Sequence, residues 1–264
     1  MKNAFLPQIS RLQPLRWGLC CGLLGFVLVG CRGTVAPPMA NPTPPPDSPS
    51  TEVPAPSAQD ALPQEALASI RDIVAQPVWV KPAQGEENAA QVGMAMQYAD
   101  TIRTEDPALV EVGLGTLVFR LGGNATLTLR PNQQLQLAAG QMITWIEGTS
   151  PGPVTIQTPV GAAGIRGTTV FVNIAEDPQA PVEIFSWEGE VTFQPIGATD
   201  VVVIRDGEQL LVSPGEVDVA ELQQRVRRFS PEEFRQRLET SPLINDFGQA
   251  LPTLPQIEAV GETL

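Results

Sequence analysis

Two pairs of closely spaced acids are the nearest approach to a hydrolytic motif in this 264-residue chain: Glu188 with Glu190, and Asp206 with Glu208. Two carboxylates in one site can serve as acid and nucleophile in glycoside hydrolysis. Acids two residues apart on a turn are far more often solvated surface groups. Asp206 and Glu208 could also touch a calcium ion, but no D-x-D-x-D-G loop accompanies them. We therefore predict no catalytic residue in either pair.

The sequence also lacks the residues and motifs on which other common catalytic mechanisms depend. The chain has no histidine, so Ser-His and Cys-His nucleophile pairs and imidazole metal ligands are excluded. P-loop, G-x-S-x-G and S-x-x-K patterns are absent as well. The sequence predicts a protein that is not an enzyme and that uses no cofactor and no metal.

Cys31 is the one residue with a chemistry that its surroundings specify. It follows a basic start with Lys2, Arg11 and Arg16, and the uncharged run Trp17–Val29, which is too short to span a membrane as a helix. Leu28-Val29-Gly30-Cys31 matches the lipobox of bacterial lipoproteins. We expect residues 1–30 to be a signal peptide and the Cys31 thiol to carry diacylglycerol, with palmitate among its acyl chains.

Processing at Cys31 would leave a strongly acidic, lipid-anchored protein. The chain carries a formal charge of −13. It falls to −16 once the three basic residues before Cys31 are removed. Such a charge disfavours nucleic-acid binding and adsorption to anionic lipid. Cys20 and Cys21 would also be removed, which excludes an internal disulfide. Arg32, not an aspartate, follows Cys31, which favours an outer-membrane location facing the periplasm.

Two segments precede the expected globular domain. Residues 31–64 are rich in proline, with Pro44, Pro45 and Pro46 in a row, and are expected to form a disordered tether. Residues 65–76 are predicted to form a short helix, because Leu67, Ile70 and Val74 recur at spacings of three and four before Pro77.

From Val78 to about residue 213 the apolar pattern changes to a period of two. Runs of four to six residues recur every 8–12 residues, with Gly, Asn, Pro or Asp between them. This pattern predicts an all-β domain over residues 77–215, built of stacked short antiparallel strands as a sandwich, roll or solenoid-like stack.

The remaining residues, 216–264, are expected to form a helical and then loose tail. Val217–Arg228 could form one short helix. Ser230-Pro231-Glu232-Glu233 is a strong helix start, with serine as cap, proline at the first position and glutamate completing a capping box. From Phe247 onward the Pro and Gly spacing predicts a loose end.

The β-region resembles the FecR-like domain over about residues 77–215. The resemblance rests on Thr158-Pro159-Val160-Gly161, on Ile165-Arg166-Gly167-Thr168-Thr169-Val170, and on Trp187-Glu188-Gly189-Glu190-Val191-Thr192-Phe193. Further matches are Asp100–Thr104, Gly122-Gly123-Asn124 in place of a D-G-S hairpin turn, and the closing turn at Arg205–Leu210. It implies an extracytoplasmic β-domain used in envelope signalling and binding.

The chain departs from the family pattern at three positions. Ala99 stands where a glycine is usual, Val170 where an aromatic is usual, and Ser186 where a valine is usual. These changes are mild for the fold but affect any surface that the family uses for a ligand.

Arg166 and Arg103 are the candidate partner-binding residues. A guanidinium has five donors, which could hold a partner's carboxylate or tie neighbouring strand carbonyls together. We favour the structural role for both. Gly167 is expected to need a positive φ or to meet a neighbouring strand. Trp79, Trp145 and Trp187 could form a sugar-stacking platform, although core packing is the stronger expectation.

Together these features predict a membrane-anchored envelope lipoprotein that presents a FecR-like domain for binding, scaffolding or signalling. Its expected partners are the membrane, through lipid on Cys31, and an envelope protein or glycan. One alternative is an anti-sigma regulator of iron transport of the FecR type. That role needs a cytoplasmic segment before a membrane helix, and only about sixteen residues precede the apolar run. The other alternative is a cell-wall carbohydrate-binding protein.

Overall fold

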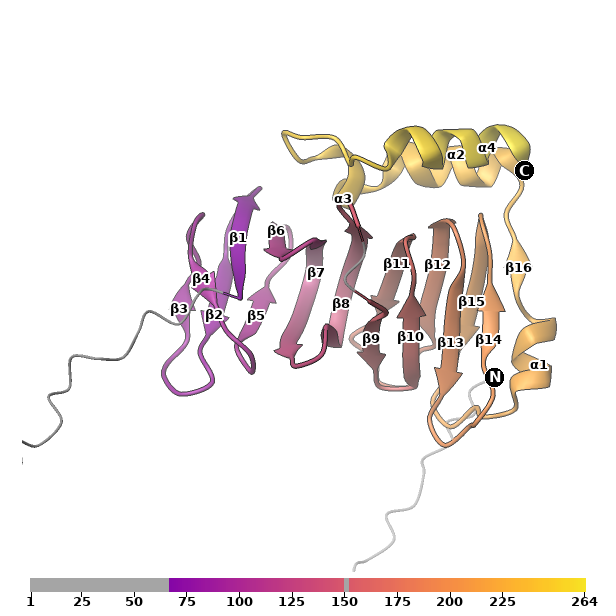
Figure 1. The fold of residues 1–264 in the computed structure, drawn as a ribbon, viewed down its shortest axis with the longest axis horizontal. Coiled ribbons are helices and arrows are strands. Elements are labelled where there is room, and N and C mark those ends of the chain that lie inside the picture. Colours follow the sequence, from indigo (N-terminus) through magenta and orange to yellow (C-terminus); the bar gives the residue numbers. More distant parts are fainter. Residues whose placement is uncertain (1–66, 150–151) are drawn as a thin grey trace, which may run out of the picture. The chain divides into compact units, whose positions relative to one another are not determined.

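The computed structural model describes residues 67–149 and 152–264 (Figure 1). The expected signal peptide, Cys31 and the proline-rich tether lie outside the described residues. The described residues belong to one compact unit, Gln59–Leu264. None of the helices in the described residues is long and apolar enough to cross a membrane.

The described residues confirm the all-β expectation, with four short helices added at the end of the chain. Within residues 67–149 and 152–264, sixteen strands form one hydrogen-bonded sheet that folds into two layers. All pairings are antiparallel except that of β8 (Gln134–Ile146) with β9 (Val154–Thr158).

The two layers share their longest strands, β7 (Leu117–Arg130) and β8. The β7–β8 register breaks between Gly122 and Thr126, where both strands bend. Gly140 on β8 permits this bend, because it has φ +82° and a Cβ there would lie 2.2 Å from the Cα of Ala125. The hairpin turn expected at Gly122-Gly123-Asn124 is therefore wrong, since these residues lie within β7. The chain reverses only after Arg130, where Asn132 and Gln133 take positive φ.

We call the first layer the covered layer. It contains the first half of β7 and the second half of β8, flanked by β1 (Ala68–Ile73), β4 (Ala95–Met96), β6 (Leu109–Leu114), β11 (Thr169–Ile174), β12 (Val182–Glu188), β15 (Glu208–Val212) and β16 (Arg227–Arg228). We call the second layer the open layer. It contains the other halves of β7 and β8, with β2 (Val78–Lys81), β3 (Asn88–Ala89), β5 (Thr101–Thr104), β9, β10 (Gly161–Ile165), β13 (Val191–Pro195) and β14 (Val202–Ile204).

The main core fills the space between the layers, because alternate residues of each strand point inward. Val112 and Phe119 from the covered layer and Leu127, Ile156 and Phe193 from the open layer belong to one continuous buried cluster. β1 takes part in this core through Ala68 and Ile70. The helix predicted over residues 65–76 is therefore wrong. A period of two in burial replaces the spacing of three and four, because β1 pairs with β6 along the sheet.

A second apolar cluster lies on the outer side of the covered layer. Its strand residues include Phe171, Phe185 and Trp187, and the C-terminal helices supply Phe234 and Ile257. The helices are α1 (Val219–Gln224), α2 (Pro231–Thr240), α3 (Pro242–Asn245) and α4 (Leu254–Thr263). Figure 1 shows α2 and α4 next to each other above β11 and β12 in that view. The expectation of a loose end after Phe247 is wrong, because α4 packs on β12 and on α2.

The predicted start of α2 is confirmed in detail. The Ser230 side chain accepts the Glu233 amide proton, and the Glu233 carboxylate accepts the Ser230 amide proton. The helix expected over Val217–Arg228 is shorter, since α1 ends at Gln224 and β16 follows.

Candidate functional site

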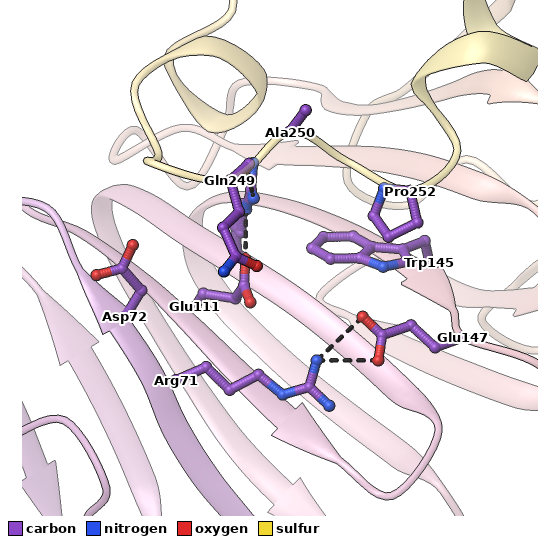
Figure 2. Close-up of a pocket in the computed structure, with 9 residues that line it drawn as sticks. Arg71, Asp72, Glu111, Trp145, Glu147, Gln249, Ala250 and Pro252 are labelled. Carbon is purple, nitrogen blue, oxygen red and sulfur yellow. Dashed lines mark hydrogen bonds and ion pairs between the residues drawn. The ribbon is translucent and has the colours of Figure 1, made fainter.

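A polar cleft of about 230 Å³ lies where the C-terminal segment crosses the covered layer (Figure 2). The strands contribute guanidinium, carboxylate and indole groups, and the chain after α3 forms the opposite wall. The lining residues are Arg71, Asp72, Glu111, Arg120, Trp145, Glu147, Gln249, Ala250 and Pro252.

Arg120 is the buried centre of this cleft, and only 1% of it is exposed. Its Nε donates to Glu111 Oε2 at 2.8 Å, across the β6–β7 pair. Its Nη1 donates to the Leu243 carbonyl oxygen at 2.9 Å, and its Nη2 donates to that of Gln249 at 2.7 Å. The guanidinium also lies 4.0 Å from the ring centre of Phe247. Arg120 therefore ties the C-terminal segment to the sheet.

Burial lowers the pKa of Arg120, while the Glu111 carboxylate raises it. An arginine stays protonated under any physiological condition, so the group remains a cation. A buried cation must be paired to be tolerated. Glu111 and the main-chain carbonyls of Leu243, Ile244 and Gln249 supply that pairing, and together they take up four of the five N–H donors of the guanidinium.

A second guanidinium, Arg71, spans the mouth of the cleft. Its Nη1 lies 3.0 Å from both carboxylate oxygens of Glu147. The side chain runs over Gly113, where a Cβ would lie 2.2 Å from Arg71 Nε. Glycine at that position lets the arginine lie flat on the sheet. About one-third of each side chain in the Arg71–Glu147 ion pair is exposed to solvent, so the pair contributes little to the stability of the fold.

The cleft is consequently better suited to holding the chain together than to acid–base chemistry. Glu111 and Glu147 each face an arginine, and the Asp72 carboxylate accepts the amide proton of Ile73. The described residues contain no group of three or more His, Cys, Asp or Glu side chains that could hold a metal ion. Trp145 Nε1 is buried and has no hydrogen-bond partner among the described residues.

The structure places Arg166 on the surface. It lies in the turn between β10 and β11, is exposed, and makes no hydrogen bond or ion pair with any described residue. The expectation that it ties strand carbonyls together is therefore wrong. Gly167 beside it has φ +66°, and a Cβ there would meet nothing within 4 Å. The expected positive φ is confirmed, and the close approach of a neighbouring strand is not the reason for glycine.

Arg103 lies on the outer face of β5 in a surface ion-pair network. Its Nη2 is 2.9 Å from Glu87 Oε2, and its Nη1 is 2.6 Å from Glu105 Oε1. Its guanidinium lies 5.9 Å from the ring centre of Trp79. Hydrogen bonds to the two carboxylates raise the pKa of Arg103, and the hydrogen bond from Arg103 lowers the pKa of Glu87. These partners come from the chain itself, which agrees with the structural role. Partner binding by Arg103 and Arg166 stays a prediction.

The three tryptophans do not form a platform. Trp145 and Trp187 are buried at 1% and 0% exposure beneath the C-terminal segment, while Trp79 lies on the open layer. Trp187 makes edge-to-face contacts with Phe185 at 4.9 Å and Phe234 at 5.2 Å. For Trp145 and Trp187 the expected core packing is confirmed.

The two acid pairs lie at the β12–β13 turn and the β14–β15 turn. Asp206 accepts the amide proton of Gly189, and Glu208 accepts that of Arg205 at 2.8 Å. Glu190 lies 3.6 Å from Arg205 in an exposed ion pair. Glu188 is different, because burial and the nearby Asp206 charge raise its pKa. Thr169 Oγ1 donates to Glu188 Oε1 at 3.0 Å and lies 2.8 Å from Thr253 Oγ1.

Comparison with known proteins gives one family match, over part of the chain. Residues 100–192 match the model of the family described as FecR protein, a range that runs from β5 to the start of β13. The chain carries a FecR domain. No curated protein matches the chain.

Two solved structures resemble parts of the chain, and both are crystal structures of a "putative anti-sigma factor" from Parabacteroides distasonis ATCC 8503. One has 14% identity and a TM-score of 0.38, and covers 45% of this chain. The other has 12% identity and a TM-score of 0.33, and covers 47%. In both cases the chain spans 56% of the solved structure's length.

The cleft around Arg120 was not predicted from the sequence. A signal was present, because Arg120 interrupts the apolar run Leu117–Leu121, where a charged residue would otherwise point into an apolar layer. The partner carbonyls come from residues more than 120 positions later in the chain. No local pattern could have revealed them.

Proposed function

We propose that the protein is a cell-envelope lipoprotein that presents its FecR domain as a non-enzymatic signalling and binding module. The observation that carries this proposal is the FecR match over the strands of the domain core. The lipobox at Cys31 supports anchoring by acylation, outside the described residues. The charges of the cleft are paired within the chain, which argues against their use in catalysis.

The anchoring half of the proposal is tested by Cys31→Ser. Cells are fed radiolabelled palmitate and fractionated, and the variant is expected to lose both the label and its place in the membrane fraction. Cys20→Ser, in the apolar run of the expected signal peptide, is the matched control and keeps both. Membrane attachment of Cys31→Ser after a high-salt wash would contradict the anchor. Separation of inner and outer membranes on a density gradient tests the outer-membrane location.

A signalling role requires a partner in the cell envelope. Chemical crosslinking in intact cells, followed by purification of the full chain, is expected to recover a specific envelope protein. A direct anti-sigma regulator is the second candidate function, which the name of the similar Parabacteroides proteins favours. Co-purification of a sigma factor, together with a cytoplasmic N-terminus in protease-protection assays, would establish that alternative over ours.

A further inference from the structure

The outer face of the open layer differs in composition from the rest of the molecule. The chain holds 29 acidic residues, yet not one Asp or Glu occurs in β2, β3, β5, β9, β10, β13 or β14, or in the halves of β7 and β8 that belong to this layer. The covered layer has acids on β1, β6, β12 and β15. In a chain of charge −13, the strands of this face add no negative charge that would repel an anionic polymer, and the loop residues Glu87 and Glu105 are paired with Arg103.

One row of side chains crosses this face from strand to strand. The pairings place Thr101 opposite Thr128, Thr128 opposite Gln136, Gln136 opposite Gln157, and Gln157 opposite Ala162. Gln194 follows beyond Ala162, and Lys81 precedes Thr101. Neighbouring strands are ~4.8 Å apart, so hydroxyl and amide groups repeat at that interval over most of the layer. We call these residues the polar row.

The polar row is accessible. Gln136 and Gln194 are exposed, and Thr128 and Gln157 are half-buried, while the residues between them on each strand point into the core. No described helix covers these side chains, since α2, α3 and α4 pack on the covered layer and α1 closes the edge at β14. A shallow hollow of about 390 Å³ lies along the row, lined by Arg130, Gln134, Gln136 and Gln157 among others.

Gln136 and Gln157 at the middle of the row retain hydrogen-bonding capacity, whereas the Thr101 and Thr128 hydroxyls bond to each other and Gln194 donates to the Ala198 carbonyl oxygen. Gln136 accepts both hydrogen bonds of Arg130 through Oε1, which leaves its amide N–H groups to donate outward. Gln157 makes no side-chain hydrogen bond with any described residue. A primary amide offers both donors and acceptors, which pairs well with a vicinal hydroxyl pair. The Arg130 cation has no acidic partner among the described residues.

We propose that the polar row is a binding site for an extended polysaccharide, either neutral or anionic. Polyhydroxylated chains present donors and acceptors along their length, as the row does. A protein partner fits less well, since protein interfaces centre on buried aromatic, Met or apolar anchors, which the row lacks. This inference goes beyond the proposed function and does not depend on acylation of Cys31.

The test is co-sedimentation of the purified full chain with insoluble polysaccharides: peptidoglycan sacculi as the anionic probe and chitin as the neutral one. We expect retention on at least one of them. The double substitution Gln136→Glu with Gln157→Glu places two carboxylates in the middle of the row, and should lower retention on sacculi at least tenfold. Gln136→Ala with Gln157→Ala should lower retention on whichever probe binds, without adding charge.

Gln256→Glu is the matched control, because Gln256 is exposed on α4, away from the open layer. It should leave retention unchanged, and all variants should keep the melting temperature of the unaltered chain. Absence of retention on both probes, or equal retention of all variants, would overturn the proposal. Loss of a crosslinked envelope protein from the row variants, without polysaccharide retention, would assign the row to a protein partner instead.

Discussion

The Gln223 side chain forms both hydrogen bonds that a neighbouring strand would form with Val203. Its Oε1 accepts the Val203 amide proton at 2.8 Å, and its Nε2 donates to the Val203 carbonyl oxygen at 3.0 Å. Val203 is the middle residue of β14, the last strand of the open layer. One glutamine on α1 thus blocks a sheet edge whose free groups would otherwise recruit another chain.

Gln223→Ala is expected to destabilise the protein by about 1 kcal/mol, because two partly exposed hydrogen bonds are lost. It should also promote self-association through β14. Urea unfolding and sedimentation velocity measure the two effects. Gln224→Ala is the control, since Gln224 is exposed on the same helix and its side chain has no hydrogen bond among the described residues. A monomeric Gln223→Ala protein of unchanged stability would show that α1 does not protect the edge.

Arg120→Lys should release the C-terminal segment. Lysine keeps the charge but cannot reach Glu111 and the two carbonyls of Leu243 and Gln249 together. With those carbonyls unpaired, we expect a loss of about 2–3 kcal/mol. Faster proteolysis after residue 240 and a red shift of tryptophan emission would report the release, since Trp145 and Trp187 lie beneath this segment.

Arg235→Lys is the control for that experiment, because Arg235 is exposed on α2. It should leave both the proteolysis rate and the emission maximum unchanged. If Arg120→Lys behaved like Arg235→Lys, the guanidinium contacts would not hold the segment in place.

We predict that the stability of the folded protein depends on pH through Glu188. Its pKa is raised in the folded state, chiefly by burial, so the folded protein binds its proton more tightly than the unfolded chain does. Stability then falls as the pH rises from the ordinary glutamate pKa through the raised one. Glu188→Gln removes this dependence. Its melting temperature relative to the unaltered chain should therefore increase between pH 4 and pH 7.

The exposed Glu190 provides the comparison, because Glu190→Gln makes the same chemical change two residues away at the surface, and the increase with pH should be larger for Glu188→Gln. A Glu188→Gln difference that stays flat with pH would mean that Glu188 ionises in the fold without penalty.

The sequence predicted features that depend on local chemistry. The capping box at Ser230 and the positive φ of Gly167 both follow from a few neighbouring residues. The two long strands were missed because Gly122-Gly123-Asn124 suits a turn, and only the pairing with β8 shows that it bends a strand instead. Gly123 and Asn124 do take the left-handed angles expected of a turn, but within a bent strand.

The structure of the C-terminal segment could not be predicted from neighbouring residues in the sequence. Pro255 and Gly261 suggested a loose end, yet proline is compatible with the first turn of α4. A Cβ at Gly261 would lie 3.1 Å from the Phe234 ring, so glycine allows α4 to approach α2 closely. The polar cleft and the second apolar cluster both depend on this packing, which joins residues far apart in the sequence.

Ala99 offers the clearest opportunity to stabilise the protein. It has φ +69°, in the left-handed region, at the position where the FecR-like pattern has glycine. The surrounding turn is held in place, since the Ala99 amide donates to the Leu129 carbonyl at 2.8 Å. The neighbouring Asp100 carboxylate accepts the amide protons of Ala83 and Gln97. The backbone cannot relax easily, so the alanine remains strained.

Ala99→Gly should therefore raise stability. The left-handed conformation costs an L-residue roughly 1–2 kcal/mol, and glycine removes this cost. Glycine also has more conformational freedom in the unfolded chain, which lowers the stability of the folded state by about 0.5–1 kcal/mol. A net gain of about 0.5–1 kcal/mol corresponds to a rise of a few degrees in melting temperature. Ala198→Gly, at a loop position without positive φ, is the matched control and should lower the melting temperature. A decrease in both variants would show that the turn at Ala99 carries no strain.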